Sequence, residues 1–191
     1  MKNIIIGMSG ATGQIYGIRL MQYLRNMPDV ETHLVLSDWA KKTIMLETDW
    51  TVEQVEALAN HVYNIDNLAA AISSGSFRRD GMVVLPCSIK TLSGIANSYN
   101  DNLLVRAADV TMKERKQLIL MLRETPLHLG HIRLMHQVTE AGAIIAPPVP
   151  AFYTKPQSLN DIINQSVLRL IDLLGLPTEG LSRWTGAEPP M

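Results

Sequence analysis

Five short apolar runs, separated by segments with helical patterns, constrain the fold of this 191-residue chain most strongly. Parallel strands that are covered on both faces read as continuous runs of Val, Ile and Leu, and the helix that joins two of them lies between the runs. A repeated order of strand and helix therefore predicts a parallel sheet with helices on both faces. We expect strands at 3–8, 33–37, 81–86, 117–122 and 143–148.

The helices that this order requires have their own signals. Thr51 with Gln54 and Ser158 with Asp161 have the spacing of capping boxes, which predicts that helices begin there. The first and last helices carry apolar stripes at the 3.6-residue period, which indicate core packing. The stripes are Tyr16, Leu20, Tyr23, Leu24 and Met27, and Ile163, Val167, Leu170, Ile171 and Leu174.

Length and charge limit the possible partners. A chain of 191 residues is expected to form one domain, residues 1–191. With 17 basic and 18 acidic side chains the net charge is −1, which argues against nucleic acid or an anionic membrane as a partner. No apolar stretch reaches the roughly 18 residues of a membrane span. The single cysteine, Cys87, cannot form an internal disulfide, so we expect a cytoplasmic protein.

The stretch GMSGATG follows the first apolar run and spaces Gly7, Gly10 and Gly13 three apart. The dinucleotide fingerprint needs GxGxxG, and a P-loop needs Lys where this chain has Gln14, so neither motif is present. A glycine turn before a helix presents N–H groups to an anion, which makes a phosphate the first candidate ligand. The alternative is that the glycines serve only the turn and close helix packing.

Polar residues follow the predicted strands where ligands bind in an open parallel sheet, at the carboxyl ends. The strands are followed in turn by SGATG, SDW, CSIKT, RET and PVPAFY. Ser88 is either an anion ligand or only an N-cap. Arg123 and Glu124 are expected to meet a ligand or other charges, because a charge near the core requires a partner. Taken together, the polar residues at the carboxyl ends of the strands predict an anion site.

Two other cationic features have two interpretations each, and a third has one. Arg106 and Lys113 lie seven residues apart on one helical face, either as a phosphate site or as a solvated face. Arg169 lies opposite the apolar stripe of its helix, toward solvent or another subunit. In the polar loop 73–80 we expect the pair Arg78 and Arg79 to be solvated.

The histidines and the cysteine are less informative. Of the grouped histidines only His136 has a partner at metal-ligand spacing, Glu140, and we expect no metal site. Cys87 follows a proline at a strand end, and a lone buried thiol is the expected interpretation rather than a nucleophile. The ten methionines and the 47% apolar content fit either oligomer interfaces or a Met-rich core.

Four segments together resemble the UbiX-like flavin prenyltransferases, including the Pad-type partners of phenolic acid decarboxylases. The segments are GMSGATGQIYGIRL, PCSIKTLSGIA, NLLVRAADVTMKERKQLILMLRETP, and AFYTKPQSLNDIINQSVLRLIDLLGL followed by RW. The resemblance covers nearly the whole chain. It implies a Rossmann-like (flavodoxin-like) three-layer α/β sandwich that binds FMN, assembles as a homododecamer and needs no metal. The implied reaction joins the dimethylallyl group of dimethylallyl phosphate to N5 and C6 of reduced FMN, and the prenylated FMN serves a UbiD-like decarboxylase.

The same resemblance implies the site residues, and it places the site between subunits. Glu47 and Glu124 are implied to handle protons, Thr12 to present a hydroxyl near N5, and Trp184 to face the allyl cation, if the tail 176–191 docks on a neighbouring subunit. FMN would contact Gly10, Ala11, Thr12, Ser37, Ser88, Ile89, Lys90, Thr91 and Arg123. The prenyl phosphate would contact Arg106, Lys113, Arg123, Tyr153 and Arg169, and Lys113 is also implied to be catalytic.

The chain departs from the family pattern in two places. Thr12 stands where Ser is usual, which keeps a hydroxyl with a stiffer rotamer. Ile89 and Lys90 replace smaller residues, so the hydrogen bonds expected there differ. The sequence leaves open which decarboxylase uses the product, and whether the donor is a monophosphate or a diphosphate.

Two other functions are possible on the same fold. A flavin-dependent cysteine decarboxylase would carry an active-site His and a PxMNxxMW-like segment, and this chain has neither. A non-catalytic FMN carrier would not need the second set of cationic residues for a prenyl phosphate.

Overall fold

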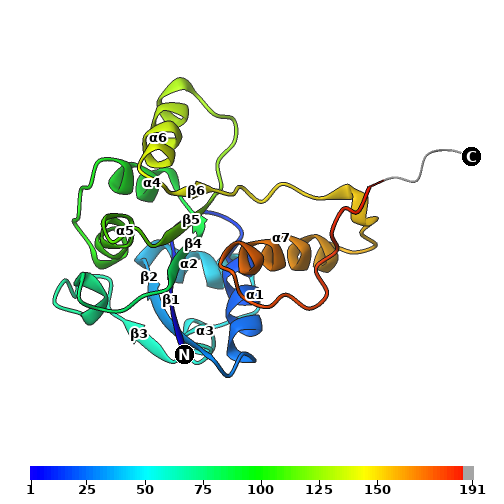
Figure 1. Ribbon diagram of the computed structural model, residues 1–191, viewed down its shortest axis with the longest axis horizontal. Coiled ribbons are helices and arrows are strands. Elements are labelled where there is room, and N and C mark those ends of the chain that lie inside the picture. The colour runs from blue at the N-terminus through cyan, green and yellow to red at the C-terminus, as the bar shows by residue number, and fades with distance from the viewer. Residues whose placement is uncertain (187–191) are drawn as a thin grey trace, which may run out of the picture.

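The structure, a computed structural model, describes residues 1–186, so the last five residues of the predicted tail lie outside it. The elements follow one another along the chain in an order of strand and helix that confirms the expected pattern (Figure 1). They are β1 (Lys2–Met8), α1 (Gln14–Arg25), β2 (Val30–Leu36), α2 (Asp38–Glu47), α3 (Val52–Glu56), β3 (His61–Tyr63), η1 (Ala71–Ser73), β4 (Gly81–Cys87), α4 (Ile89–Ala96), α5 (Leu103–Lys113), β5 (Gln117–Leu122), α6 (Leu129–Glu140), β6 (Ile144–Ile145), η2 (Phe152–Thr154) and α7 (Leu159–Leu173).

The six strands form one sheet in the order β3-β2-β1-β4-β5-β6, and every neighbouring pair is parallel. After β1 the chain adds β2 and β3 on one side of it, and then adds β4, β5 and β6 on the other side. The switch between these two central strands opens a crevice at their carboxyl ends, where ligands bind in open α/β sheets. Without the short β3 the strands follow the 2-1-3-4-5 order of flavodoxin-like folds. The predicted fold class is confirmed.

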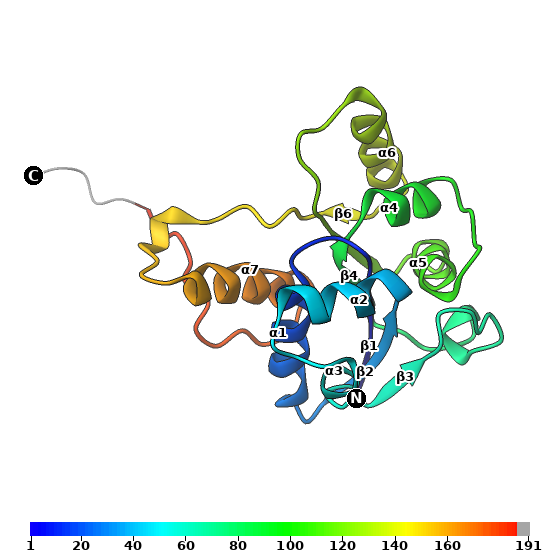
Figure 2. The same ribbon diagram turned by 180° about the vertical axis from the view of Figure 1, so that it is seen from behind.

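Alternating side chains of β1 divide the core into two layers. Ile4, Ile6 and Met8 pack with the apolar stripes of α1 and α7, and Ile5 packs on the opposite face against α4 and α5. Buried residues of α2 and α3 belong to the α1 layer, and Figure 2 shows these two short helices beside α1. Both predicted capping boxes are present, at the starts of α3 and α7.

Two strands differ from the prediction. The strand β3 was not predicted, because its three residues, HVY, are mostly exposed and form an edge of the sheet. The run at 143–148 forms only the two-residue β6, because the prolines at 147 and 148 have no N–H group to donate to a ladder.

Arg79 was expected to be solvated, and this prediction is wrong. The side chain is only 2% exposed, and its guanidinium donates to the carbonyl oxygens of Ala107, at 3.3 Å, and Ser74. Burial lowers the pKa of Arg79. Arg78 is exposed as expected. A guanidinium satisfied by backbone carbonyls leaves no pattern in the sequence, because every residue has a carbonyl oxygen and one of these acceptors, Ala107, lies 28 residues along the chain.

The described part of the chain after β6, residues 146–186, forms an arm. After β6 the chain runs away from the sheet to η2, α7 returns toward α1, and the segment 176–186 runs back along α7 (Figure 1). The described part of the tail thus packs on its own chain, and docking on a neighbouring subunit remains a prediction. Among residues 1–186, none of the helices has the length and apolar character needed to cross a membrane.

Candidate functional site

A cleft of about 910 Å³ lies at the carboxyl ends of the central strands, where the sheet order switches. The turns after β1, β2, β4 and β5 all contribute to its wall, and the start of α5 closes one side. The structure brings seven of the predicted site residues to this wall. They are Gly10, Ser37, Ser88, Ile89, Lys90, Thr91 and Glu124.

The N-terminus of α4 is the anion-binding part of the cleft. Ser88 Oγ accepts a hydrogen bond from the N–H of Thr91 at 3.3 Å and lies 3.1 Å from the Thr91 hydroxyl. Ser88 is therefore the N-cap. Within the described residues the N–H groups of Ile89 and Lys90 have no acceptor, so they remain available to a ligand. Free N–H groups, hydroxyls and the helix dipole together suit a terminal phosphate.

The N-terminus of α1 is occupied by a side chain of the protein. Glu47 Oε2 accepts hydrogen bonds from the N–H groups of Gly13, at 2.8 Å, and Gln14, at 3.3 Å. A carboxylate in this position takes the donors that a phosphate would need and repels a second anion. The glycine turn is therefore not the phosphate site that the sequence suggested, and Glu47 has a capping role that its place in the sequence did not predict.

Two residues that the sequence interpretation missed hold the glycine turn in place. Ser9 Oγ accepts from the N–H of Ser88 at 2.8 Å and donates to the carbonyl of Pro86 at 2.9 Å, so it joins the turns after β1 and β4. Gln14 Nε2 donates to the carbonyls of Ser9 and Ala11, both at 2.8 Å. Both side chains are buried. A polar residue beside a glycine turn is only a weak sequence signal for hydrogen bonds of this kind.

Trp39 was also missed, although it lines the cleft. It lies in the first turn of α2, remains 63% exposed, and has Lys42 Nζ 4.5 Å from the centre of its ring. A Cβ atom added to Gly10 would lie 2.4 Å from Trp39 Cβ. This close approach explains why the turn has glycine at this position. Thr12 lies at the exposed tip of the same turn.

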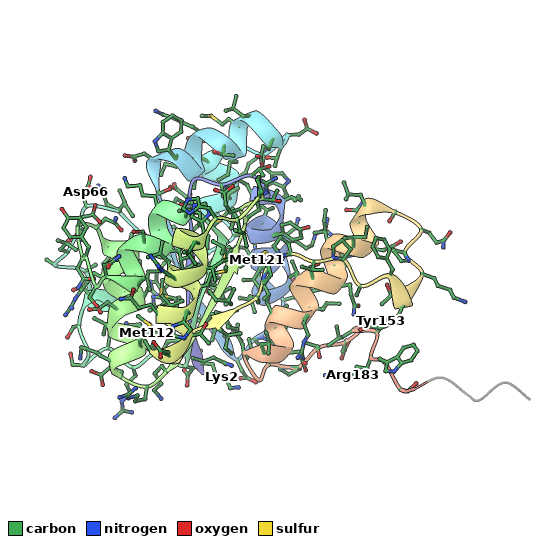
Figure 3. The ribbon with its side chains drawn as sticks, turned by 90° about the horizontal axis from the view of Figure 1, so that it is seen from above. Lys2, Asp66, Met112, Met121, Tyr153 and Arg183 are labelled. Carbon is green, nitrogen blue, oxygen red and sulfur yellow. The ribbon has the colours of Figure 1, made fainter. Side chains whose placement is uncertain are left out.

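A second group of predicted residues lies on the arm rather than in the cleft. The rings of Tyr153 and Trp184 meet edge to face, with centroids 5.8 Å apart. Arg169 faces away from the apolar stripe of α7, as predicted, and forms an ion pair with Asp172. All three predicted side chains are exposed in the single chain. Figure 3 shows Tyr153 and Arg183 close together on this arm, far from Asp66 of the cleft.

A third group surrounds the loop before β4. Arg106 Nε donates to the carbonyl of Ser73 at 3.1 Å, and its Nη1 lies 3.2 Å from Asp109 Oδ2. Lys113 pairs with Glu114 beside Gly75. Because α5 runs away from the cleft, Lys113 lies near the start of β5, whereas Arg123 follows its end. One chain therefore does not bring Lys113 to Arg123, Tyr153 and Arg169.

The charges at the end of β5 are more exposed than expected. The Arg123 side chain is exposed and makes no hydrogen bond or ion pair within residues 1–186. Its strand ends there, so the charge never enters the core. Glu124 is half-buried at the cleft wall, and its Oε1 accepts from the N–H of Thr125 at 3.0 Å.

Cys87 is a lone buried thiol, as expected. It is fully buried, and burial raises its pKa to about 12, so it is protonated at neutral pH and is not a nucleophile. His136 Nδ1 lies 3.3 Å from Glu140 Oε2 on an exposed helix face.

Away from the cleft, Glu31, His33 and His61 lie close enough to be considered as metal ligands. The two imidazole rings are stacked with an 11° angle between their planes. The lone pairs of the rings lie in those planes, so they do not converge on one ion as they are placed.

A parallel sheet with a cleft at its switch point and a free helix N-terminus in that cleft is the architecture of proteins that bind nucleotides or flavins. The family model described as Flavoprotein matches residues 1–168. The flavin prenyltransferase UbiX of Escherichia coli K12 is 59% identical over 189 residues, which cover 98% of this chain and 100% of that protein. The chain therefore belongs to the flavoprotein family and, within it, to the UbiX-like flavin prenyltransferases.

Two solved structures share the fold over nearly their whole length. The crystal structure of AnUbiX (PadA1) in complex with FMN and dimethylallyl pyrophosphate has a TM-score of 0.95 and 52% identity, covering 98% of this chain and 99% of that one. The dodecameric FMN-dependent UbiX-like decarboxylase from Escherichia coli O157:H7 has a TM-score of 0.94 and 49% identity, covering 96% and 100%.

Proposed function

We propose that this chain is a flavin prenyltransferase, which joins a dimethylallyl group from dimethylallyl phosphate to N5 and C6 of reduced FMN. The observation that carries the proposal is the 59% identity to a flavin prenyltransferase over 98% of this chain and 100% of that protein. The fold shared with a solved structure that holds FMN and dimethylallyl pyrophosphate supports it. The product, prenylated FMN, is supplied to a UbiD-like decarboxylase.

The cleft fits FMN, which has a single terminal phosphate. The free N–H groups and hydroxyls at the start of α4 suit that phosphate, whereas a pyrophosphate would need a second anion site and the α1 terminus is taken by Glu47. Bound reduced flavin supplies the nucleophilic N5 and C6 atoms. The residues that would hold FMN are Gly10, Ala11, Thr12, Ser37, Ser88, Ile89, Lys90, Thr91 and Arg123.

The remaining predicted residues suit the departure of an allylic phosphate. When the bond between C1 and oxygen breaks, the leaving phosphate gains charge, and preorganised cationic and hydroxyl donors stabilise that charge. Trp184 offers an aromatic face to the allylic carbon as it becomes cationic. Glu47 and Glu124 are the carboxylates that exchange protons. The donors are Arg106, Lys113, Arg123, Tyr153 and Arg169.

The complete site takes residues from several copies of the chain. The cleft, the arm and the loop beside Lys113 lie apart within one chain, and the arm residues are exposed. A homododecamer, the assembly named for the relative from Escherichia coli O157:H7, would bring them together. We also propose a cytoplasmic location, which the single unpaired Cys87 supports because such chains are typical of a reducing compartment.

The direct test is to incubate the purified protein with reduced FMN and either dimethylallyl phosphate or dimethylallyl diphosphate. Mass spectrometry then measures the mass of the flavin product. We expect the mass of prenylated FMN. A non-catalytic carrier would return FMN unchanged, which would overturn the proposal. The two donors separate monophosphate from diphosphate specificity.

A mixing experiment tests the shared site. Arg169→Ala subunits lack the arm cation, and Ser88→Asp subunits repel the flavin phosphate, so each is expected to be inactive alone. Mixed oligomers regain activity, because some sites combine an intact arm with an intact cleft. Mixing Arg169→Ala with Tyr153→Phe is the control, since both changes affect the arm. If native mass spectrometry shows hybrids that remain inactive, the site is not shared in this way.

A further inference from the structure

The outward face of α7 holds the C-terminal segment of the chain. Gln165, Arg169 and Asp172 are spaced at i, i+4 and i+7, which places them on one face of the helix. Four of the five buried residues of α7, Ile163, Val167, Leu170 and Ile171, lie on the other face, and the fifth, Leu168, lies beside the polar face. The segment 182–184 runs across the polar face and carries Trp184.

Gln165 satisfies both backbone groups of one residue in this segment. Its Nε2 donates to the carbonyl of Ser182 at 2.9 Å, and its Oε1 accepts from the N–H of Ser182 at 3.3 Å. The hydroxyl of Tyr153 donates to the same carbonyl at 3.2 Å. The side chain of Gln165 therefore fixes the segment in register with Tyr153, two residues before Trp184.

Asp172 holds two arginines at once. Arg183 reaches both carboxylate oxygens, with Nη1 at 3.3 Å from Oδ2, and Arg169 pairs with Oδ2. The hydrogen bond from Arg183 lowers the pKa of Asp172. Because one carboxylate faces two guanidinium groups, the cluster keeps a net positive charge and can still attract a phosphate.

We propose that Gln165 and Asp172 are positioning residues that assemble the prenyl-donor half of the site on the arm, with Trp184 held against Tyr153 and Arg169 oriented beside them. The proposal rests on the proposed function and deepens it. Trp184 is 63% exposed, so no core packing of its own keeps it in place. The bonds to Gln165 and Asp172 supply that restraint, and a site held in advance loses less entropy when the donor binds.

The first test measures position without activity. In a Trp39→Phe, Trp50→Phe background Trp184 is the single tryptophan, and its fluorescence anisotropy and acrylamide quenching report how firmly it is held. We expect Gln165→Ala and Asp172→Asn to lower the anisotropy and raise the quenching. Glu179→Gln is the matched control, because Glu179 is exposed on the same segment and makes no hydrogen bond or ion pair within residues 1–186. Unchanged anisotropy in both variants would overturn the proposal.

The second test separates positioning from charge. Gln165→Ala and Asp172→Asn are expected to lower kcat by about 10-fold to 100-fold, the range that a small misplacement of reacting groups produces. Asp172→Asn is also expected to raise the KM for the donor, and Asp172→Glu, which keeps the carboxylate, to recover part of the loss. If Asp172 were only a competing anion, Asp172→Asn would lower the KM and leave kcat unchanged, and the proposal would be wrong.

A double-mutant cycle tests whether Gln165 acts through Trp184. The losses in kcat of Gln165→Ala and Trp184→Phe are expected to be non-additive, because the first change releases the residue that the second removes. Additive losses would contradict the mechanism. If the wild-type protein makes no prenylated FMN at all, the proposed function fails, and the anisotropy measurement alone decides whether Gln165 and Asp172 position the segment.

Discussion

Replacing Glu47 by Gln separates two roles of one carboxylate. The structure shows Glu47 Oε2 as the acceptor for the N–H groups of Gly13 and Gln14, at 2.8 and 3.3 Å, so it caps α1 and fixes the glycine turn. The proposed function also makes it a proton-handling group. Gln keeps an oxygen that can accept both hydrogen bonds, and it cannot transfer the proton.

The expected magnitudes differ enough to be distinguished. Glu47 is exposed, so the loss of its charge at the helix N-terminus costs about 0.3–1 kcal/mol in the free energy of unfolding. Glu47→Ala also removes the acceptor, and loss of a cap costs about 0.5–2 kcal/mol. At about 2–4 °C per kcal/mol for a chain of this size, both variants remain folded at room temperature. Loss of a general acid or base slows a reaction by about 10² to 10⁴.

The assays are thermal unfolding, calorimetric FMN binding and the rate of prenylated FMN formation. For Glu47→Gln we expect a small drop in Tm, unchanged FMN affinity and a large loss of rate. Asp49→Asn is the control, because Asp49 is exposed nearby and forms no hydrogen bond or ion pair in the described part of the chain. Wild-type turnover by Glu47→Gln would remove Glu47 from the chemistry and leave it only a capping role.

Three other expectations follow from the cleft, the core and the sheet edge. FMN is expected to bind and FAD and NAD are not, since the cleft offers one terminal phosphate site; tight binding of FAD in calorimetry would refute this. Cys87, with its pKa raised to about 12 and no exposure, is expected to resist iodoacetamide at pH 8 in the folded protein and to react after unfolding, as mass spectrometry would show. Burial and the neighbouring His61 lower the pKa of His33 to about 4 from 6.5, so the unfolded chain binds the proton more tightly. Between pH 6.5 and 4 the free energy of unfolding should therefore fall as pH falls, by up to about 1.4 kcal/mol per pH unit from this group. Denaturant unfolding of the wild type and of His33→Asn at several pH values gives the slope of the free energy of unfolding against pH for each protein. Equal slopes would contradict the lowered pKa of His33.

Local patterns predicted most of the fold. The apolar runs and the capping boxes consist of residues close together in the sequence, so β1, β4, β5, α1 and α7 were found close to where the structure has them, and β2 was found although it begins three residues earlier than predicted. The short β3 was missed because an exposed edge strand of three residues needs no apolar run. The candidate site was found in part for the same reason, since the N-cap of α4 and the residues after the strands are local signals.

Contacts between distant residues account for what the sequence did not show. Glu47 caps a helix that begins 33 residues earlier in the chain, and Ser9 meets Ser88 across the switch point. Arg79 is buried against α5, where it donates to a backbone carbonyl oxygen. Because every residue has such an oxygen, the sequence does not show which one accepts the hydrogen bond. Helical spacing correctly put Arg106 and Lys113 on one helix, and it contained no information about the direction in which that helix leaves the cleft.

The exposure of the arm residues supports the proposal that the site is completed when subunits assemble. Tyr153 is 48% exposed and Trp184 is 63% exposed in the single chain, and the Arg169 side chain is also exposed. In bulk water two unit charges 4 Å apart attract each other by about 1 kcal/mol, and at the effective dielectric constant of a protein surface by about 4 kcal/mol. Under the proposed function, the cations of the arm would therefore stabilise a departing phosphate well only when another subunit displaces the water. In the proposed assembly, one copy of the chain would supply the flavin cleft and a neighbouring copy would supply the arm residues that bind the prenyl phosphate.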